Sequence, residues 1–120
     1  EKGLEKLGAM SWRDFSVVLD TAFTRQGYTV SQLSGGADLL LEKKHVRTVV
    51  SAKRWKAAAM GVEPLRELVS RRDALEASNS VCISLGQVSA KAQEFAADNR
   101  ISLITGADLV ILVDEEIKAL

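Results

Sequence analysis

The stretch GGADLLLEKKHVRTVVSAKRWK, residues 35–56, decides the fold. Residues 37–42 and 46–53 are rich in leucine and valine, which pack well on a pleated sheet, and they predict two consecutive strands. The polar triplet at 43–45 predicts a short connection between them. The stretch therefore indicates an antiparallel hairpin near the middle of the chain.

Charged and polar side chains stand at one end of this hairpin. Side chains alternate along a strand, so Ser51 and Lys53 share one face of the second strand. With a turn at 43–45, the numbers of paired residues sum to about 88, which places Asp38 opposite Val50. We therefore expect Asp38, Ser51 and Lys53 to face a common ligand.

Periodicity in the rest of the chain predicts helices and further strands. Ser11 is expected as an N-cap, Gly27 as the residue that ends the first helix, and Pro64 in the first turn of the second. The predicted helices are 11–26, 62–77, 89–99 and 106–113, and the further strands are 28–33, 80–85 and 101–104. The segment ADLVILV at 107–113 also fits a strand. This order of elements predicts an α/β fold with one mixed sheet and helices on both faces.

Length and composition predict one domain. The chain has 120 residues, 47% of them hydrophobic, which is enough to bury a core. Residues 1–9 show little periodicity and are expected to form a flexible lead-in to a domain at 10–120. No apolar run is long enough to span a bilayer, and no signal peptide is visible. The first residue is Glu1 rather than Met, which favours an excised domain and leaves open a membrane anchor or second domain outside this chain.

Charge and cysteine content set further limits. Sixteen basic residues balance sixteen acidic ones, so net charge gives no argument for nucleic acid. Basic residues nevertheless gather at 43–56 and acidic residues at 108–116, which predicts a basic and an acidic pole. The single cysteine, Cys82, excludes an internal disulfide and a multi-cysteine metal site. Its apolar neighbours predict a buried, unreactive thiol.

A carboxylate and a lysine at the end of a hairpin suit phosphodiester hydrolysis. Asp38 would hold Mg²⁺, which polarises a phosphate and acidifies a water, and Lys53 would orient that water or stabilise charge on the phosphate. The same residues also fit a solvated acid in a turn and a lysine that extends from a strand end. Spacing alone leaves both interpretations open.

Six segments in order make the first interpretation more specific. They are SWRDFSVVLDTAFTRQGY, GGADLLL, VVSAKRWK, MGVEPLREL, SVCISLGQVSAKAQEFAADN and ISLITGADLVIL. Over about residues 10–113 the chain resembles the Mrr-like restriction endonuclease family, a type IV restriction family within the PD-(D/E)xK nuclease superfamily. The resemblance implies a three-layer α/β/α restriction-endonuclease-like fold, with a central mixed five-stranded sheet flanked by helices.

The resemblance assigns Asp38 to the family's metal-binding aspartate and Lys53 to its catalytic lysine. The family's Gln or Glu two residues before the lysine is Ser51 here, which we count with the catalytic pair as a site residue. The helix glutamate that follows Phe15 in the family pattern is Ser16. Both departures remove metal-facing oxygens, so the resemblance implies a depleted site that holds Mg²⁺ weakly or not at all. The acids left to substitute are Asp20, Glu42 and Glu67.

Basic and aromatic side chains near the lysine predict contacts with DNA. Lys43, Arg54 and Lys56 are candidates for binding backbone phosphates. Trp55 fits both stacking on a base and packing as a lid over the core. His45, at the hairpin tip, is a poor candidate for a catalytic base.

Three functions stay open from the sequence. The chain is a weak Mg²⁺-dependent DNA endonuclease, a nuclease fold that binds DNA without cutting it, or an assembly module of a larger protein. The expected partner is double-stranded DNA, with a homodimer as one assembly state and no small-molecule cofactor. The expected location is the cytoplasm, which includes the cytoplasmic side of a membrane-anchored protein.

Overall fold

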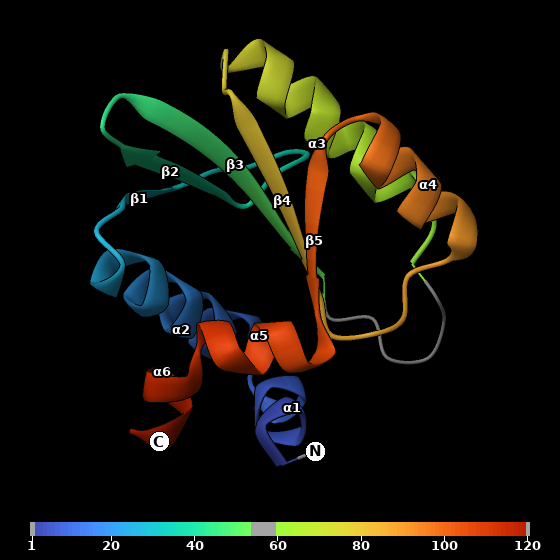
Figure 1. The fold of residues 1–120 in the computed structure, drawn as a ribbon. Helices are drawn as coiled ribbons and strands as arrows, with labels where there is room; N and C mark the ends of the chain where they lie inside the picture. The colour runs from blue at the N-terminus through green and yellow to red at the C-terminus, as the bar shows by residue number, and fades with distance from the viewer. Residues whose placement is uncertain (1, 54–59, 120) are drawn as a thin grey trace.

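One mixed sheet organises the chain, as Figure 1 shows for a computed structural model that describes residues 2–53 and 60–119. Its strands are β1 (Thr29–Gln32), β2 (Leu39–Lys43), β3 (Val46–Lys53), β4 (Asn79–Ser84) and β5 (Ile101–Thr105). They lie side by side in chain order within a five-stranded sheet. The first three strands pair antiparallel and the last three parallel. The predicted mixed sheet is confirmed.

The hairpin between β2 and β3 closes through a tighter turn than the sequence suggested. Lys44 and His45 form the turn with backbone φ angles of 52° and 68°. Lys43 therefore pairs with Val46, and Leu39 with Val50. The register lies one residue away from the prediction, because the turn contains two residues rather than three.

Helices cover both faces of the sheet (Figure 1). They are α1 (Lys2–Ala9), α2 (Trp12–Arg25), α3 (Glu63–Ala74), α4 (Ala90–Asp98), α5 (Gly106–Leu112) and α6 (Asp114–Lys118). One core cluster joins α1, α2, α5 and α6 to one face of the sheet. A second cluster joins α3 and α4 to the other face. This is the three-layer arrangement that the resemblance implies.

The helix ends follow the predicted capping residues. The Ser11 hydroxyl accepts a 3.1 Å hydrogen bond from the backbone N–H of Asp14. Ser89 caps α4 in the same way, through the N–H of Ala92 at 3.1 Å. Gly27 follows α2 with a φ of +98°, which favours glycine. These local signals place α2 and α4 correctly.

The first residues of the chain differ from the expectation, and the helix predicted at 106–113 is confirmed. Residues 1–9 were expected as a flexible lead-in, but α1 forms there, and its Leu7 is 0% exposed within the core. A Cβ on Gly3 would lie 3.2 Å from a methyl of Val110, so α1 packs closely against α5. The segment at 107–113 is helical, since this geometry buries Leu109 and leaves Ile111 72% exposed.

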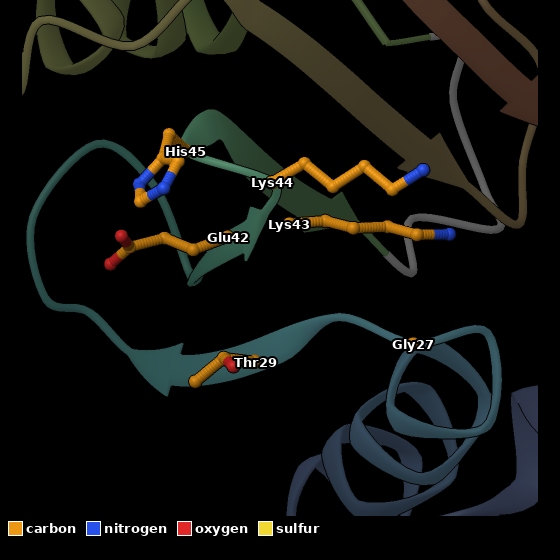
Figure 2. A pocket seen from close by; sticks show the side chains of 6 residues that line it. All are labelled: Gly27, Thr29, Glu42, Lys43, Lys44 and His45. Carbon is orange, nitrogen blue, oxygen red and sulfur yellow. The ribbon is translucent and has the colours of Figure 1, made fainter.

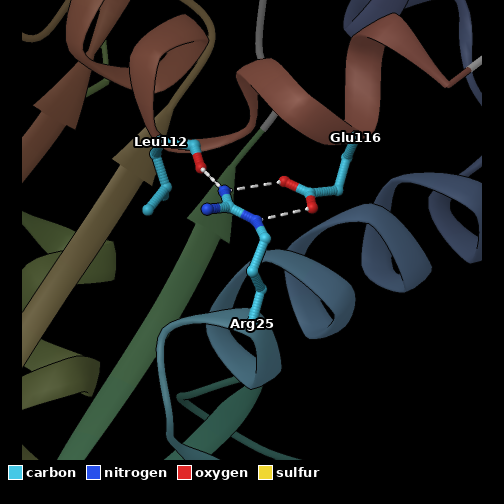
Figure 3. A network of polar contacts seen from close by, with 3 residues as sticks. All are labelled: Arg25, Leu112 and Glu116. Carbon is cyan, nitrogen blue, oxygen red and sulfur yellow. Dashed lines mark hydrogen bonds and ion pairs between the residues drawn. The ribbon is translucent and has the colours of Figure 1, made fainter.

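A polar contact ties the last helix to α2 (Figure 3). The Arg25 guanidinium donates to both carboxylate oxygens of Glu116, at 3.0 and 3.2 Å. It also donates to the carbonyl of Leu112 at 3.3 Å. The contact raises the pKa of Arg25 through its hydrogen bond to Glu116.

Among residues 2–53 and 60–119, none of the helices has the length and apolar character of a membrane-spanning segment.

Candidate active site

Asp38 lies immediately before β2 and is tied to β3 by both its backbone and its side chain. Its N–H donates to the carbonyl of Val50 at 2.8 Å. Its Oδ2 accepts a 2.7 Å hydrogen bond from the backbone N–H of Ala52. The carboxylate is half-buried. It is therefore held beside the segment of β3 that carries Ser51 and Lys53.

The turn before Asp38 is fixed against α3. Gly36 has a φ of +79°, a conformation that other residues rarely adopt. A Cβ at this position would lie 2.6 Å from Cγ of Arg71 and 3.2 Å from the carbonyl oxygen of Glu67. Glycine therefore lets the chain approach α3 closely two residues before the candidate metal ligand.

Lys53 ends β3 and is held by the neighbouring strand. It pairs with Ser84 in the parallel register between β3 and β4. Its carbonyl accepts a 3.0 Å hydrogen bond from the N–H of Leu85. The Ser84 hydroxyl is buried and donates to the carbonyl of Gly86 at 3.1 Å. Asp38 and Lys53 thus lie at the same end of the hairpin, as the alternation of side chains predicts.

Ser51 shares the face of Lys53, but its hydroxyl is enclosed. The residue is 0% exposed. Within the described residues its Oγ has no hydrogen-bond partner. An unpaired buried hydroxyl costs about 1–3 kcal/mol of stability. Ser51 therefore places an unused oxygen beneath the site instead of lining an open pocket.

The pKa of the Cys82 thiol is affected by the charges of both Asp38 and Lys53. It pairs with Ser51 between β3 and β4 and is fully buried. Burial raises the pKa of its thiol to about 12, while the charge of Lys53 lowers the pKa and that of Asp38 raises it. Both charges therefore act on one atom beneath the site. The predicted burial of the cysteine is confirmed.

The acids that the sequence offered as substitutes have other polar partners or are exposed. Asp20 accepts a hydrogen bond from the Thr24 hydroxyl at 3.1 Å. Glu42 lies near the far end of β2, and its carboxylate is 3.9 Å from Arg47. The side chain of Glu67 is exposed on α3. Across residues 2–53 and 60–119, no three His, Cys, Asp or Glu residues are placed to hold a metal ion together.

The available oxygens still fit one weakly held ion. Mg²⁺ keeps several waters and is commonly bound by one or two carboxylates together with substrate phosphates. Asp38 supplies one such carboxylate, and the enclosed Ser51 hydroxyl marks where a longer side chain would add a second oxygen. Ser16, at the other departure from the family pattern, is half-buried on α2. The donor set fits Mg²⁺ only with a substrate phosphate present.

The predicted DNA-contact residues do not all gather at this site. Lys43 lies at the opposite end of β2 from Asp38. Its Nζ donates to the carbonyl of Gln26 at 2.9 Å and stands 5.0 Å from the centre of the Tyr28 ring. The other predicted contacts, Arg54, Trp55 and Lys56, lie outside the described residues. His45 is exposed at the hairpin tip, away from Asp38 and Lys53.

Sequence reasoning missed the groups that position the pair. The backbone N–H of Ala52 has no sequence signature, because every residue except proline carries one. Ser84 is a polar residue that directly follows the apolar run Val81–Ile83, and this pattern is the one available signal. Met60 was also missed: its N–H donates to Gln87 at 2.8 Å, and its carbonyl accepts from Ser89 at 2.9 Å. These bonds hold the loop that follows β4.

The chain is similar to known proteins in both sequence and fold. The Mrr catalytic-domain family model, described as restriction endonuclease, matches residues 7–113. Among solved structures, the DNA modification-dependent restriction endonuclease AspBHI is similar, with a TM-score of 0.72 and 16% identity. The similarity covers 98% of this chain and 38% of that one. No curated protein matches.

Two further solved structures share the fold. The MspJI restriction endonuclease, solved in complex with a 27-mer oligonucleotide, has a TM-score of 0.57 and 19% identity, over 99% of this chain and 29% of that one. A protein of unknown function, AF1548, has a TM-score of 0.67 and 12% identity, over 82% of this chain and 62% of that one. The chain therefore spans less than two thirds of the length of each of these relatives.

Proposed function

Because the chain belongs to the Mrr-type restriction endonuclease family, we propose that it is a DNA-binding nuclease domain that cleaves phosphodiester bonds weakly with Mg²⁺. One observation carries the proposal. A 2.7 Å hydrogen bond from the backbone N–H of Ala52 fixes the Asp38 carboxylate. Ala52 is the residue directly before Lys53 in β3. An acid and a lysine held at one end of a hairpin form the smallest set that this chemistry requires.

Asp38 has one oxygen engaged by Ala52, which leaves the other to face a ligand. When bound, Mg²⁺ polarises the phosphate and lowers the pKa of a coordinated water. The half-buried Lys53 has its backbone fixed by β4, so its ammonium is presented from a rigid strand end. In this position it stabilises negative charge on the phosphate or orients the attacking water.

Double-stranded DNA is the partner that we propose. Arg54 and Lys56 follow Lys53 in the sequence and carry the charges suited to backbone phosphates, with Trp55 between them. The double variant Arg54→Ala with Lys56→Ala should reduce the salt dependence of DNA binding by about two units of slope. Binding that is insensitive to salt would exclude this role.

The homodimer stays a prediction. Sedimentation of the domain would test it.

A DNA-binding domain without cleavage is the second candidate. It is favoured because Asp38 is joined by no further pair of metal-binding side chains within the described residues. Ser16 and Ser51, where the family pattern has longer oxygen ligands, point the same way. An assembly role in a larger protein is the third reading. It predicts neither DNA binding nor cleavage.

Nicking of supercoiled plasmid DNA in Mg²⁺ or Mn²⁺ tests the proposal. The wild type should nick slowly, and Asp38→Asn and Lys53→Ala should each abolish nicking. Lys91→Ala, which removes an exposed lysine of α4, is the matched control and should retain it. Nicking by Asp38→Asn at the wild-type rate would show that the site is elsewhere. DNA binding without nicking in any variant would favour the second candidate.

A further inference from the structure

A groove runs along the tip of the β2–β3 hairpin, at the end of β2 away from Asp38 (Figure 2). Its volume is about 430 Å³. It is lined by Gly27, Thr29, Glu42, Lys43, Lys44 and His45. The groove therefore lies between the hairpin tip and the connection from α2 to β1, and three of its lining residues carry basic side chains.

The turn at this tip has an unfavourable sequence for its backbone. Lys44 and His45 have φ angles of 52° and 68°, and both positions favour glycine or asparagine. Asn-Gly would form this two-residue turn with less strain. The chain instead places two basic side chains there, and strained backbone retained in this way is a feature of functional sites.

The charges in the groove are arranged on one side. Lys43 and Lys44 extend in the same direction in Figure 2, while Glu42 points the opposite way. Lys43 is held in position by the Gln26 carbonyl at 2.9 Å. The carboxylate of Glu42 lies 3.9 Å from Arg47, which partly offsets its charge. One side of the groove therefore presents two cations, of which Lys43 is held in place by a hydrogen bond.

The groove and the Asp38–Lys53 site lie at opposite ends of the hairpin. Strand β3 runs from Val46 beside the tip to Lys53. Its eight residues span roughly 26 Å at about 3.3 Å each. A nucleic-acid duplex rises about 3.4 Å per base pair, so this length corresponds to about eight base pairs. A duplex longer than this can reach both ends.

We propose that this groove is a second contact for nucleic-acid backbone phosphates, separate from the Asp38–Lys53 site. The inference rests on the proposed DNA binding. The groove binds duplex that flanks the site, and Lys44 is the phosphate contact, with Lys43 beside it. It gives affinity without sequence specificity, because phosphate contacts carry no base information.

The double variant Lys44→Asn with His45→Gly tests the proposal, since it should move stability and binding in opposite directions. An Asn-Gly turn relieves the backbone strain, so the midpoint of thermal unfolding should rise. The charge is lost, so affinity for a 20-base-pair duplex should fall about three- to tenfold and the salt slope should drop by about one unit. Fluorescence anisotropy over a range of salt concentrations measures the affinity and the salt slope, and thermal unfolding followed by circular dichroism measures the midpoint.

Two further variants separate charge from backbone. Lys44→Gln with His45→Gln keeps the strained turn and should lose DNA affinity to the same extent without gaining stability. Lys91→Gln removes another exposed charge, on α4 away from the groove (Figure 1), and should leave the affinity unchanged. A tip variant that folds and binds the duplex with wild-type affinity and slope would overturn the inference.

Failure of the inference is distinguishable from failure of the proposed function. If the wild type binds no duplex, both fall. If the wild type binds and the tip variants bind equally, the groove alone is excluded.

Binding to vesicles of phosphatidylserine and phosphatidylcholine tests whether the cations recognise a lipid surface instead of DNA. Vesicle binding that the tip variants lose, together with unchanged DNA binding, would assign the cations to a lipid surface and contradict the proposal.

Discussion

The Asp38 carboxylate accepts a 2.7 Å hydrogen bond from the backbone N–H of Ala52. This bond connects the residue before β2 to β3. It holds the carboxylate at Ala52, the residue directly before Lys53. One carboxylate oxygen accepts this bond, and we propose that the other faces a ligand. The site is therefore part of the fold as well as a candidate for chemistry, and the two roles can be separated by mutation.

Replacement of Asp38 should separate its structural role from its role as a ligand. Asp38→Ala removes the acceptor of the Ala52 N–H and should lower the free energy of unfolding by about 1–2 kcal/mol. Asp38→Asn keeps an oxygen acceptor and should stay within about 0.5 kcal/mol of the wild type. Urea unfolding followed by circular dichroism measures both. Equal stability of Asp38→Ala and the wild type would mean that this bond does not position the acid.

Restoring the two departures from the family pattern should strengthen the site. Ser51→Gln with Ser16→Glu adds two oxygen ligands and should tighten Mn²⁺ binding about ten- to hundredfold. Ser51→Ala is the control. It removes a buried hydroxyl that has no partner among the described residues, so it should leave stability unchanged or slightly raised and should not strengthen metal binding. A correctly folded double variant that binds metal no better than Ser51→Ala would count against the assignment.

Cys82 should be unreactive and should couple folding to alkaline pH. Burial raises the pKa of its thiol from 9.0 to about 12, so the unfolded chain loses the proton first as the pH rises. The stability contributed by the protonated thiol is fully present below about pH 9 and is lost toward pH 12. Relative to Cys82→Ala, the wild type should lose about 1.4 kcal/mol per pH unit across this window. Parallel stability curves for the two proteins, or rapid alkylation of the folded wild type, would refute this.

Arg72 should be a stability residue with no part in DNA binding. It is 7% exposed on α3 and donates to the Ser80 hydroxyl at 3.1 Å and to the Asn99 carbonyl at 2.6 Å. Arg72→Ala removes the donor to both acceptors and should lower the free energy of unfolding by about 2–4 kcal/mol. Arg66→Ala, on the exposed side of the same helix, should cost less than about 0.5 kcal/mol. Similar costs for the two variants would show that burial does not set the importance of Arg72.

The sheet could be predicted because its signals are local. Valine-rich and leucine-rich runs, Gly27 and the caps at Ser11 and Ser89 each depend on residues close in sequence. The pairing of the two strands then placed Asp38 and Lys53 at one end of the hairpin. The one-residue error in register arose because Lys44 and His45 adopt a two-residue turn that normally selects for asparagine and glycine.

Other features depend on contacts that the sequence does not display. Helix α1 lacks a capping signal, and its order comes from Leu7 in a core built by distant segments. Arg72 looks like an exposed helix residue, and only packing against Ser80 buries it. At the site, the enclosure of Ser51 arises from neighbouring strands and helices. No pattern of residue types within β3 alone predicts it.

Calorimetric titration of Mn²⁺ and Mg²⁺ into the domain tests the central claim most directly, with an uncleavable duplex present to supply the phosphate. The wild type should show weak, saturable binding. Asp38→Asn should show none while keeping the fold and its affinity for the duplex. Equal metal binding by Asp38→Asn and the wild type would contradict the assignment of Asp38 as the metal ligand, and the absence of binding by both would contradict the proposal of a metal-dependent nuclease.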